Sequence, residues 1–218
     1  MSLSRIHLPI GTAVVLIIMS CVGFAASAKV ERTGALSGNG VSDAARTAVE
    51  DKGYRVTLED GWMAEFWFAK HIDSQDNAAP GALYPKLPGG AFIGIVKFPQ
   101  GMSDFRGQSI PPGTYTLRYE LMPQDGNHMG VAPDPDFLLA SPVADDSRPE
   151  QLYVFRKLAA LSAKTTGTGH PAVLALEAAG EPSTVVKQGD GSIVFTAELP
   201  IGGGKEKLGI VIKGTATQ

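Results

Sequence analysis

The amino-acid sequence predicts a mainly β protein, an antiparallel β-sandwich of jelly-roll type with one or two short helices. Many short segments either alternate apolar and polar residues or form brief apolar runs, and glycine, proline, asparagine and aspartate separate them. Strand patterns do not alternate regularly with helical patterns, as they would in a parallel α/β sheet. Turn-rich spacing of this kind is typical of antiparallel architectures.

The first residues indicate export from the cytoplasm. Arg5 precedes an apolar run from Ile10 to Met19, and Ala26-Ser27-Ala28 has small residues where a signal peptidase cleaves. The sequence therefore predicts a signal peptide over residues 1–28 and a periplasmic or secreted protein. Two alternatives stay open, an uncleaved signal anchor and lipidation of Cys21, and either one would place the protein on the membrane of the cell envelope.

The part after the leader is predicted to have two regions. Residues 29–52 are expected to form a flexible lead-in and a short helix capped by Ser42, and residues 53–218 a single β-sandwich domain. Without residues 1–28, which contain one arginine, 18 basic and 22 acidic residues remain, a net charge of −4. No basic run accompanies this charge, so we expect no nucleic-acid partner.

Within the domain, the first expected unit is a hairpin. Residues 54–59 and 62–69 have strand patterns, and Asp60-Gly61 between them suits a two-residue turn. The buried apolar run 92–98 follows, and then Pro111-Pro112-Gly113 introduces the clearly alternating strand 114–122. The remaining strands are expected at 137–141, 173–177, 184–187, 193–199 and 208–213. One helix is expected over 148–163, where Ser147 and Glu150 form a capping-box pattern.

Two resemblances accompany this pattern. Gln108–Leu117 reads QSIPPGTYTL, which is similar to the edge that introduces a strand in transthyretin-like and carboxypeptidase-regulatory-like modules, and resembles a bacterial domain family of unknown function. Over Gly53–Ala69, Asp104–Phe137 and Leu161–Leu176 the chain resembles an uncharacterised group of exported bacterial β-sandwich proteins. The resemblance implies a β-sandwich and transfers no activity.

Glu65 is the first candidate binding residue. A two-residue turn would pair Val56 with Glu65 and Tyr54 with Trp67, which places the carboxylate on an apolar face. A carboxylate there needs a partner or a proton. It would be either a ligand-binding group in a pocket lined by Trp67 and Tyr54 or a structural partner of an arginine such as Arg118. A register shift of one residue would instead turn it to solvent.

The opposite face of the same strand has Trp62, Phe66 and Phe68. These aromatic residues would form either a second packed layer or an exposed platform for a sugar or a partner protein. Large aromatic side chains are more often buried, so packing is the favoured interpretation.

A metal site is the second candidate. His128 and His170, with Asp125 and Asp134, could bind copper or zinc in an exported protein. However, no two histidines have the spacing of metal ligands, and Asp125 also begins the sequence Asp-Gly-Asn, which is typical of a turn. Solvated loop side chains therefore remain the simpler interpretation of this set.

The sequence has no Gly-x-Ser-x-Gly or His-Glu-x-x-His pattern, and Gly202-Gly203-Gly204-Lys205 lacks the spacing of a phosphate loop. We therefore expect a non-catalytic binding or interaction module of the cell envelope, without a cofactor, for an unknown protein, small-molecule or carbohydrate ligand. The alternatives are a metal-dependent periplasmic protein or enzyme, and a structural protein of the envelope anchored through Cys21.

Overall fold

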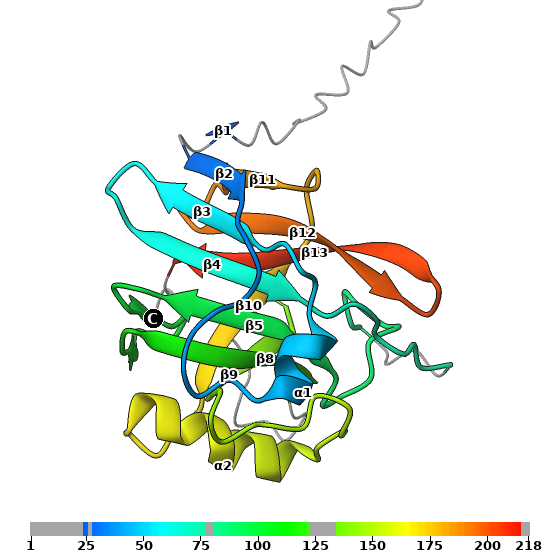
Figure 1. Cartoon of the computed structure of the whole chain (residues 1–218). Helices are drawn as coiled ribbons and strands as arrows, with labels where there is room; N and C mark the ends of the chain where they lie inside the picture. Colours follow the sequence, from blue (N-terminus) through cyan, green and yellow to red (C-terminus); the bar gives the residue numbers. More distant parts are fainter. Residues whose placement is uncertain (1–23, 26–27, 77–80, 123–133, 215–218) are drawn as a thin grey trace, which may run out of the picture.

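The computed structural model describes residues 24–25, 28–76, 81–122 and 134–214 (Figure 1). Its elements in chain order are β1 (Phe24–Ala25), β2 (Ala28–Arg32), α1 (Asp43–Ala48), β3 (Tyr54–Leu58), β4 (Met63–Phe68), β5 (Phe92–Phe98), β6 (Met102–Ser103), β7 (Ser109–Ile110), β8 (Gly113–Leu121), β9 (Asp136–Pro142), α2 (Phe155–Thr166), β10 (Ala172–Glu177), β11 (Thr184–Lys187), β12 (Ile193–Ile201) and β13 (Gly204–Lys213). All nine strands expected from the sequence are present, with ends that differ by no more than four residues.

Eleven of the strands form one antiparallel sheet in the order β1-β11-β12-β13-β10-β9-β8-β5-β4-β3-β2, and β6 pairs with β7. The sheet curls until it is nearly closed into a barrel. Its two ends meet where β2 lies beside β11, with Cα atoms of the two strands within 8 Å of each other (Figure 1). β2 forms no ladder with β11 or β12, and we call the line between β2 on one side and β11 and β12 on the other the seam.

The mainly β, antiparallel class predicted from the sequence is confirmed, whereas the jelly-roll-like sandwich is not. The pairs β9–β10 and β10–β13 carry the sheet without a break from one side of the core to the other.

The core of the barrel is aromatic where the two sides meet. The ring of Phe195 lies 5.8 Å from Tyr54, 5.3 Å from Phe66 and 6.4 Å from Phe68, measured between centroids. The packed-layer interpretation of Phe66 and Phe68 is therefore the one that the structure supports.

Residues 29–32, expected as part of a flexible lead-in, belong to strand β2, which pairs along the whole of β3. The short helix α1 follows as expected. The Ser42 hydroxyl accepts a hydrogen bond of 3.1 Å from the Ala45 amide, which satisfies one of the free N–H groups at the start of the helix.

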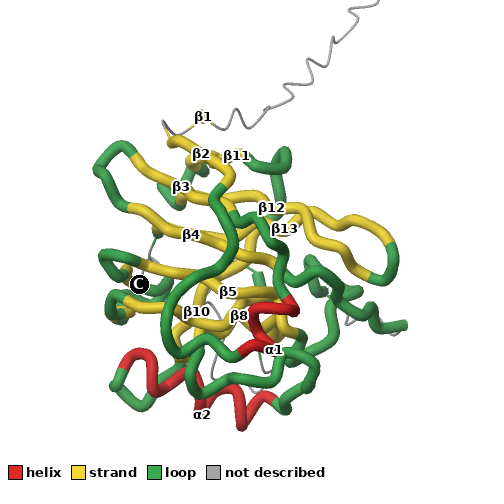
Figure 2. The backbone as a smooth tube through the Cα atoms, viewed as in Figure 1, coloured by secondary structure: helices red, strands yellow, loops and turns green. Residues whose placement is uncertain are grey.

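Helix α2 lies outside the sheet, as does α1 (Figure 2). Leu158 of α2 packs on Phe137, Leu139 and Val173 of β9 and β10. The helix was expected to begin near residue 148 but begins at Phe155. The capping-box residues do not cap it, because residues 148–151 form turns whose carbonyls accept hydrogen bonds from a buried arginine described below.

Within the described residues, the longest helix is α2 with 12 residues, and no helix is long and apolar enough to cross a membrane.

Candidate functional site

The position of every side chain on β3 and β4 follows from the loop that joins them. The Leu58 amide donates to the Trp62 carbonyl (2.9 Å), the Gly61 amide donates to Leu58 (3.0 Å), and Gly61 has a φ of +81°. The loop therefore has three residues, with glycine in the left-handed conformation that such loops use. The predicted two-residue turn was wrong by one residue. Tyr54 pairs with Phe66 instead of Trp67, and each side chain of β4 faces the opposite way from the prediction.

Glu65 consequently lies on the outer face of the barrel, paired with Arg55. Its side chain is 9% exposed. The carboxylate accepts hydrogen bonds from Arg55 Nε (3.0 Å) and Nη2 (2.7 Å), while Lys97 Nζ lies 4.0 Å away. The burial of Glu65 and its charged partner agree with the prediction. Its outer-face position and its pairing with Arg55 instead of Arg118 do not. Glu65 is thus an element of a structural ion-pair cluster on the outer face.

Trp67 shares that outer face and is almost fully buried. Its indole Nε1 donates a hydrogen bond of 2.9 Å to the carbonyl of Gly34, in the segment that crosses from β2 to α1. Trp67 therefore fastens this segment to the sheet, and it does not share a pocket with Tyr54.

Arg118 of β8 is the largest fully buried side chain in the described part of the protein. It forms a two-point ion pair with Asp146, from Nε to Oδ2 (2.6 Å) and from Nη2 to Oδ1 (2.9 Å). Its remaining N–H groups donate to the carbonyls of Gly90 (2.9 Å), Arg148 (2.8 Å) and Gln151 (2.7 Å). All five donors of the guanidinium are therefore used within the protein. Arg118 anchors the chain before α2 to the outer face of the sheet and has no donor left for a ligand.

Asp136 forms a second buried anchor at the start of β9. Its carboxylate accepts hydrogen bonds from the Tyr119 hydroxyl (2.6 Å) and from the amides of Leu83 (2.9 Å) and Tyr84 (3.0 Å). Burial raises the pKa of Tyr84 to about 12 and raises the pKa of Tyr119 as well. These hydroxyls stay protonated at ordinary pH, and the hydrogen bonds to Asp136 hold Leu83 and Tyr84 against the start of β9.

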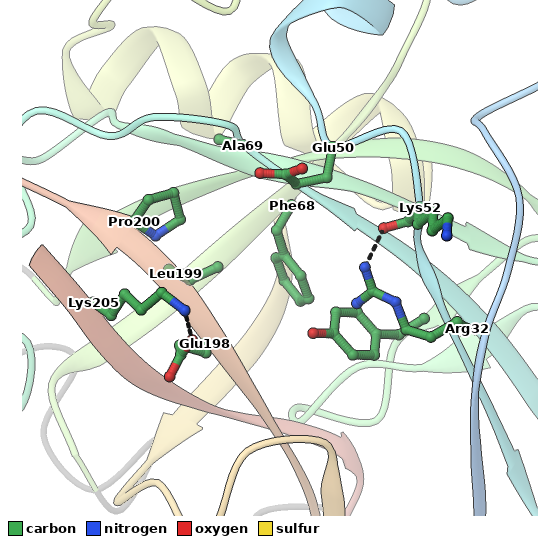
Figure 3. A pocket seen from close by; sticks show the side chains of 10 residues that line it. Arg32, Glu50, Lys52, Phe68, Ala69, Glu198, Leu199, Pro200 and Lys205 are labelled. Atoms are coloured by element: carbon green, nitrogen blue, oxygen red, sulfur yellow. Dashed lines mark hydrogen bonds and ion pairs between the residues drawn. The ribbon is translucent and has the colours of Figure 1, made fainter. Parts of the chain in front are cut away.

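Tyr54 is the predicted binding residue that does lie at a hollow. The hollow opens on the seam, between the ends of β2, β3 and β4 on one side and β12 and β13 on the other, and has a volume of about 200 Å³ (Figure 3). Phe68 and Leu199 form its floor, and both belong to the barrel core. Tyr54 forms part of its wall, where its ring is covered by the Arg32 guanidinium at 4.1 Å. We call this site the seam hollow.

The rim of the seam hollow is charged on both sides. Arg32 donates a hydrogen bond of 3.1 Å to the Lys52 carbonyl, and Lys205 pairs with Glu198 at 2.6 Å across from it (Figure 3). Glu50 lies above the floor in the same view. The seam hollow therefore combines an apolar floor with three cationic and two anionic residues at its rim.

In the part of the chain that the structure describes, the predicted metal ligands do not lie together. Asp125 and His128 lie outside the described residues. Asp134 precedes the start of β9 and exposed His170 precedes the start of β10, and these strands are antiparallel with Ala172 opposite Ala140. The four residue steps of strand from Asp136 to Ala140 alone span about 13 Å, and Asp134 lies beyond them. The part of the chain that the structure describes contains no group of three His, Cys, Asp or Glu residues able to hold a metal ion.

The sequence did not identify most residues of the seam hollow. Arg32 was assigned to the lead-in, and Phe68 was assigned to the wrong face of its strand together with the register. Glu198 and Lys205 are more than 140 residues away from Tyr54 along the chain. Only the strand pattern of Lys29–Arg32, with Val30 between charged residues, could have indicated that Arg32 ends a strand.

Comparisons of the chain with protein families, with curated proteins and with solved structures found no match.

Proposed function

We propose that this chain is an exported binding module of the cell envelope, without catalytic activity, that binds its ligand in the seam hollow. Export is supported by the predicted leader over residues 1–28. The observation that carries the binding role is the arrangement in Figure 3, where apolar and aromatic side chains form a floor below a charged rim. Binding sites typically combine a mainly apolar surface with a few polar groups that orient the ligand.

The residues of the seam hollow favour binding over catalysis. Among the described residues that line it there is no histidine, serine, threonine or cysteine. Glu198 is neutralised by Lys205, and the Arg32 guanidinium is fixed over Tyr54 and on the Lys52 carbonyl. These contacts orient charge at the rim without pairing a nucleophile with a base, which covalent catalysis requires.

A ligand screen against the exported protein tests this proposal. A library of small aromatic compounds and short peptides is screened by saturation-transfer NMR, and the affinity of each ligand found is measured for two variants. Tyr54→Ala removes a wall of the seam hollow and should weaken binding at least tenfold. Trp62→Ala removes another half-buried aromatic side chain, at a hollow lined by Met102 and Ile212, and should leave binding unchanged.

Two results would contradict the proposal. One is a set of ligands whose affinity depends on Trp62 and not on Tyr54. The other is a screen in which nothing binds the folded protein. Circular dichroism of both variants shows whether each retains the β structure of the parent.

A further inference from the structure

We infer that the ligand of the seam hollow is an extended peptide, which adds to the open edge of β12 and places one large apolar side chain on the floor, with an acidic group beside it. This inference rests on the proposed function. It is carried by backbone groups at the seam, the size of the hollow and the charge of its rim.

Strand β12 has one open position that faces the seam. In an antiparallel strand, the N–H and C=O of one residue point to the same side, and alternate residues point to the same neighbour. The Thr196 carbonyl accepts a hydrogen bond from Ser183 (2.8 Å), and the Pro200 carbonyl accepts one from Ile72 (3.0 Å). Both therefore point away from β13, and so do the N–H and C=O of Glu198 between them.

No described strand pairs with Glu198 on that side. The ladder between β11 and β12 ends at Thr184 and Thr196, and the contact with Ile72 begins only at Pro200. Glu198 is also a residue of the seam hollow. A donor and an acceptor with the spacing of a strand edge thus face the hollow, which is the feature that peptides use in strand addition.

The opposite side of the seam presents a matching edge. The Thr33 amide donates to the Gly53 carbonyl (3.0 Å), so the odd-numbered residues at this end of β2 point to β3. Arg32 therefore directs its peptide groups to the seam. A strand between two others needs about 10 Å, twice the usual spacing. Since β2 and β11 come within 8 Å of each other, the place for a peptide is the Arg32 and Glu198 end, where the seam hollow lies.

The volume of the hollow favours a peptide over a larger organic ligand. Sites for drug-sized molecules usually have about 300–1,000 Å³, whereas the seam hollow has about 200 Å³. That space suits a single apolar side chain, with the rest of the affinity coming from backbone pairing. Phe68 and Leu199 would contact this side chain.

The charge of the rim indicates the flanking group. Arg32, Lys52 and Lys205 outnumber Glu50 and Glu198, although the whole chain has a net charge of −3. Lys205 is already paired with Glu198. The excess positive charge at Arg32 and Lys52 is complementary to an acidic residue or a terminal carboxylate of the peptide.

The test uses phage-displayed random heptapeptides selected on the exported protein, followed by synthetic copies of the selected peptides. Glu198→Pro removes the open N–H and leaves the ladder to β13 intact, and Pro200 shows that this edge accepts proline two residues further on. Glu198→Ala is the matched control, because it removes the same ion pair with Lys205 but keeps the N–H.

We expect selected peptides with a shared large apolar residue and a nearby acidic residue. Glu198→Pro should weaken their binding at least tenfold and Glu198→Ala less than threefold. The exposed variant Lys52→Glu, which leaves the core untouched, should weaken binding severalfold. N-methylation of the peptide amides, one at a time, should abolish binding at one or two positions.

Equal binding of the peptides to Glu198→Pro and to the parent would overturn the inference. An equal loss of affinity in Glu198→Pro and Glu198→Ala would also overturn it, because it would assign the contact to the Glu198 carboxylate instead of the backbone N–H. Failure to select any peptide would overturn it too. If small molecules still bind in a Tyr54-dependent manner, only the peptide inference fails. If they do not, the proposed function fails with it.

Discussion

Removal of the Asp146 carboxylate, by Asp146→Ala, should cost far more stability than the same change at the adjacent Asp145. The side chain of Asp146 is 0% exposed and that of its partner Arg118 is 1% exposed. Arg118 is also held by three backbone carbonyls, in Gly90, Arg148 and Gln151. The guanidinium therefore cannot turn to water when its carboxylate is deleted, and an uncompensated charge stays buried.

The magnitude follows from this burial. Loss of one partner of a buried ion pair costs about 3–5 kcal/mol. The ion pair of Asp145 with Lys164 spans 3.3 Å, and its side chains are 40% and 55% exposed. Such a surface pair contributes about 0–1 kcal/mol. For a domain of this size, about 1 kcal/mol shifts Tm by about 2–4 °C. Asp146→Ala should thus lower Tm by roughly 6–20 °C, and Asp145→Ala by less than about 4 °C.

Urea unfolding followed by tryptophan fluorescence measures both variants. The slope against urea should not change, because the native surface area does not. In about 1 M salt the effect of Asp145→Ala should vanish, whereas that of Asp146→Ala should persist, since a buried pair is poorly screened. Free energies of unfolding that differ by less than about 1 kcal/mol between the two variants would refute the anchoring role of Arg118.

Four further predictions concern Glu120, Glu65, metal binding and the leader. Burial raises the pKa of Glu120 from 4.5 to about 7, so between these pH values the folded state retains a proton that the unfolded state loses. The free energy of unfolding should therefore fall by up to about 3 kcal/mol as the pH rises through this window. Urea unfolding at each pH measures the fall, which should be absent in Glu120→Gln. Glu65→Gln should lower the free energy of unfolding by about 1 kcal/mol, because the side chain of its partner Arg55 is 44% exposed and can be hydrated. A loss above about 3 kcal/mol in urea unfolding would show that the ion pair of Glu65 with Arg55 is effectively buried. Copper and zinc should bind the purified protein without residues 1–28 more weakly than about micromolar. Tight calorimetric binding abolished by His128→Ala would instead support the metal-dependent alternative. When the full chain is expressed in cells, the intact mass of the protein recovered outside the cytoplasm should correspond to a chain that begins at Lys29. Retention of residues 1–28 or a diacylglyceryl mass on Cys21 would exclude cleavage at this position.

The strands could be predicted because their signal is local. In β8, Tyr115, Leu117 and Tyr119 face the core while Thr116 and Arg118 face outward, and this alternation is visible in the sequence alone. The same rule could not give the pairing of β3 with β4. That pairing depends on whether Glu59 belongs to the strand or the loop, and Asp60-Gly61 is compatible with both. One residue of loop length then decided the face of Glu65, Trp67 and Phe68 together.

The seam hollow could not be predicted for a different reason. Arg32 and Glu198 reach it from opposite ends of the sheet order, so their proximity exists only because the sheet curls. Curvature is set by many side chains in the core, among them the contact of Phe195 with Phe66 across the barrel. No short sequence pattern encodes such a contact. Tyr54 was found because it begins a clear strand, although its predicted neighbours were wrong.

Cleavage at the predicted site would change which strand edges are paired along the seam. β1, Phe24–Ala25, pairs with β11, whereas β2 begins at Ala28 and pairs with β3, so these two strands lie on opposite sides of the seam. Cleavage after Ala28 would remove β1 and leave the outer edge of β11 without that partner. Exposed strand edges readily pair with other chains unless they are short or charged. β11 has four residues and ends at Lys187, and β2 has the charged Lys29, Glu31 and Arg32. These features restrict pairing along most of the seam, so that removal of the leader would leave the hollow at Glu198 as the position where a strand can still be added.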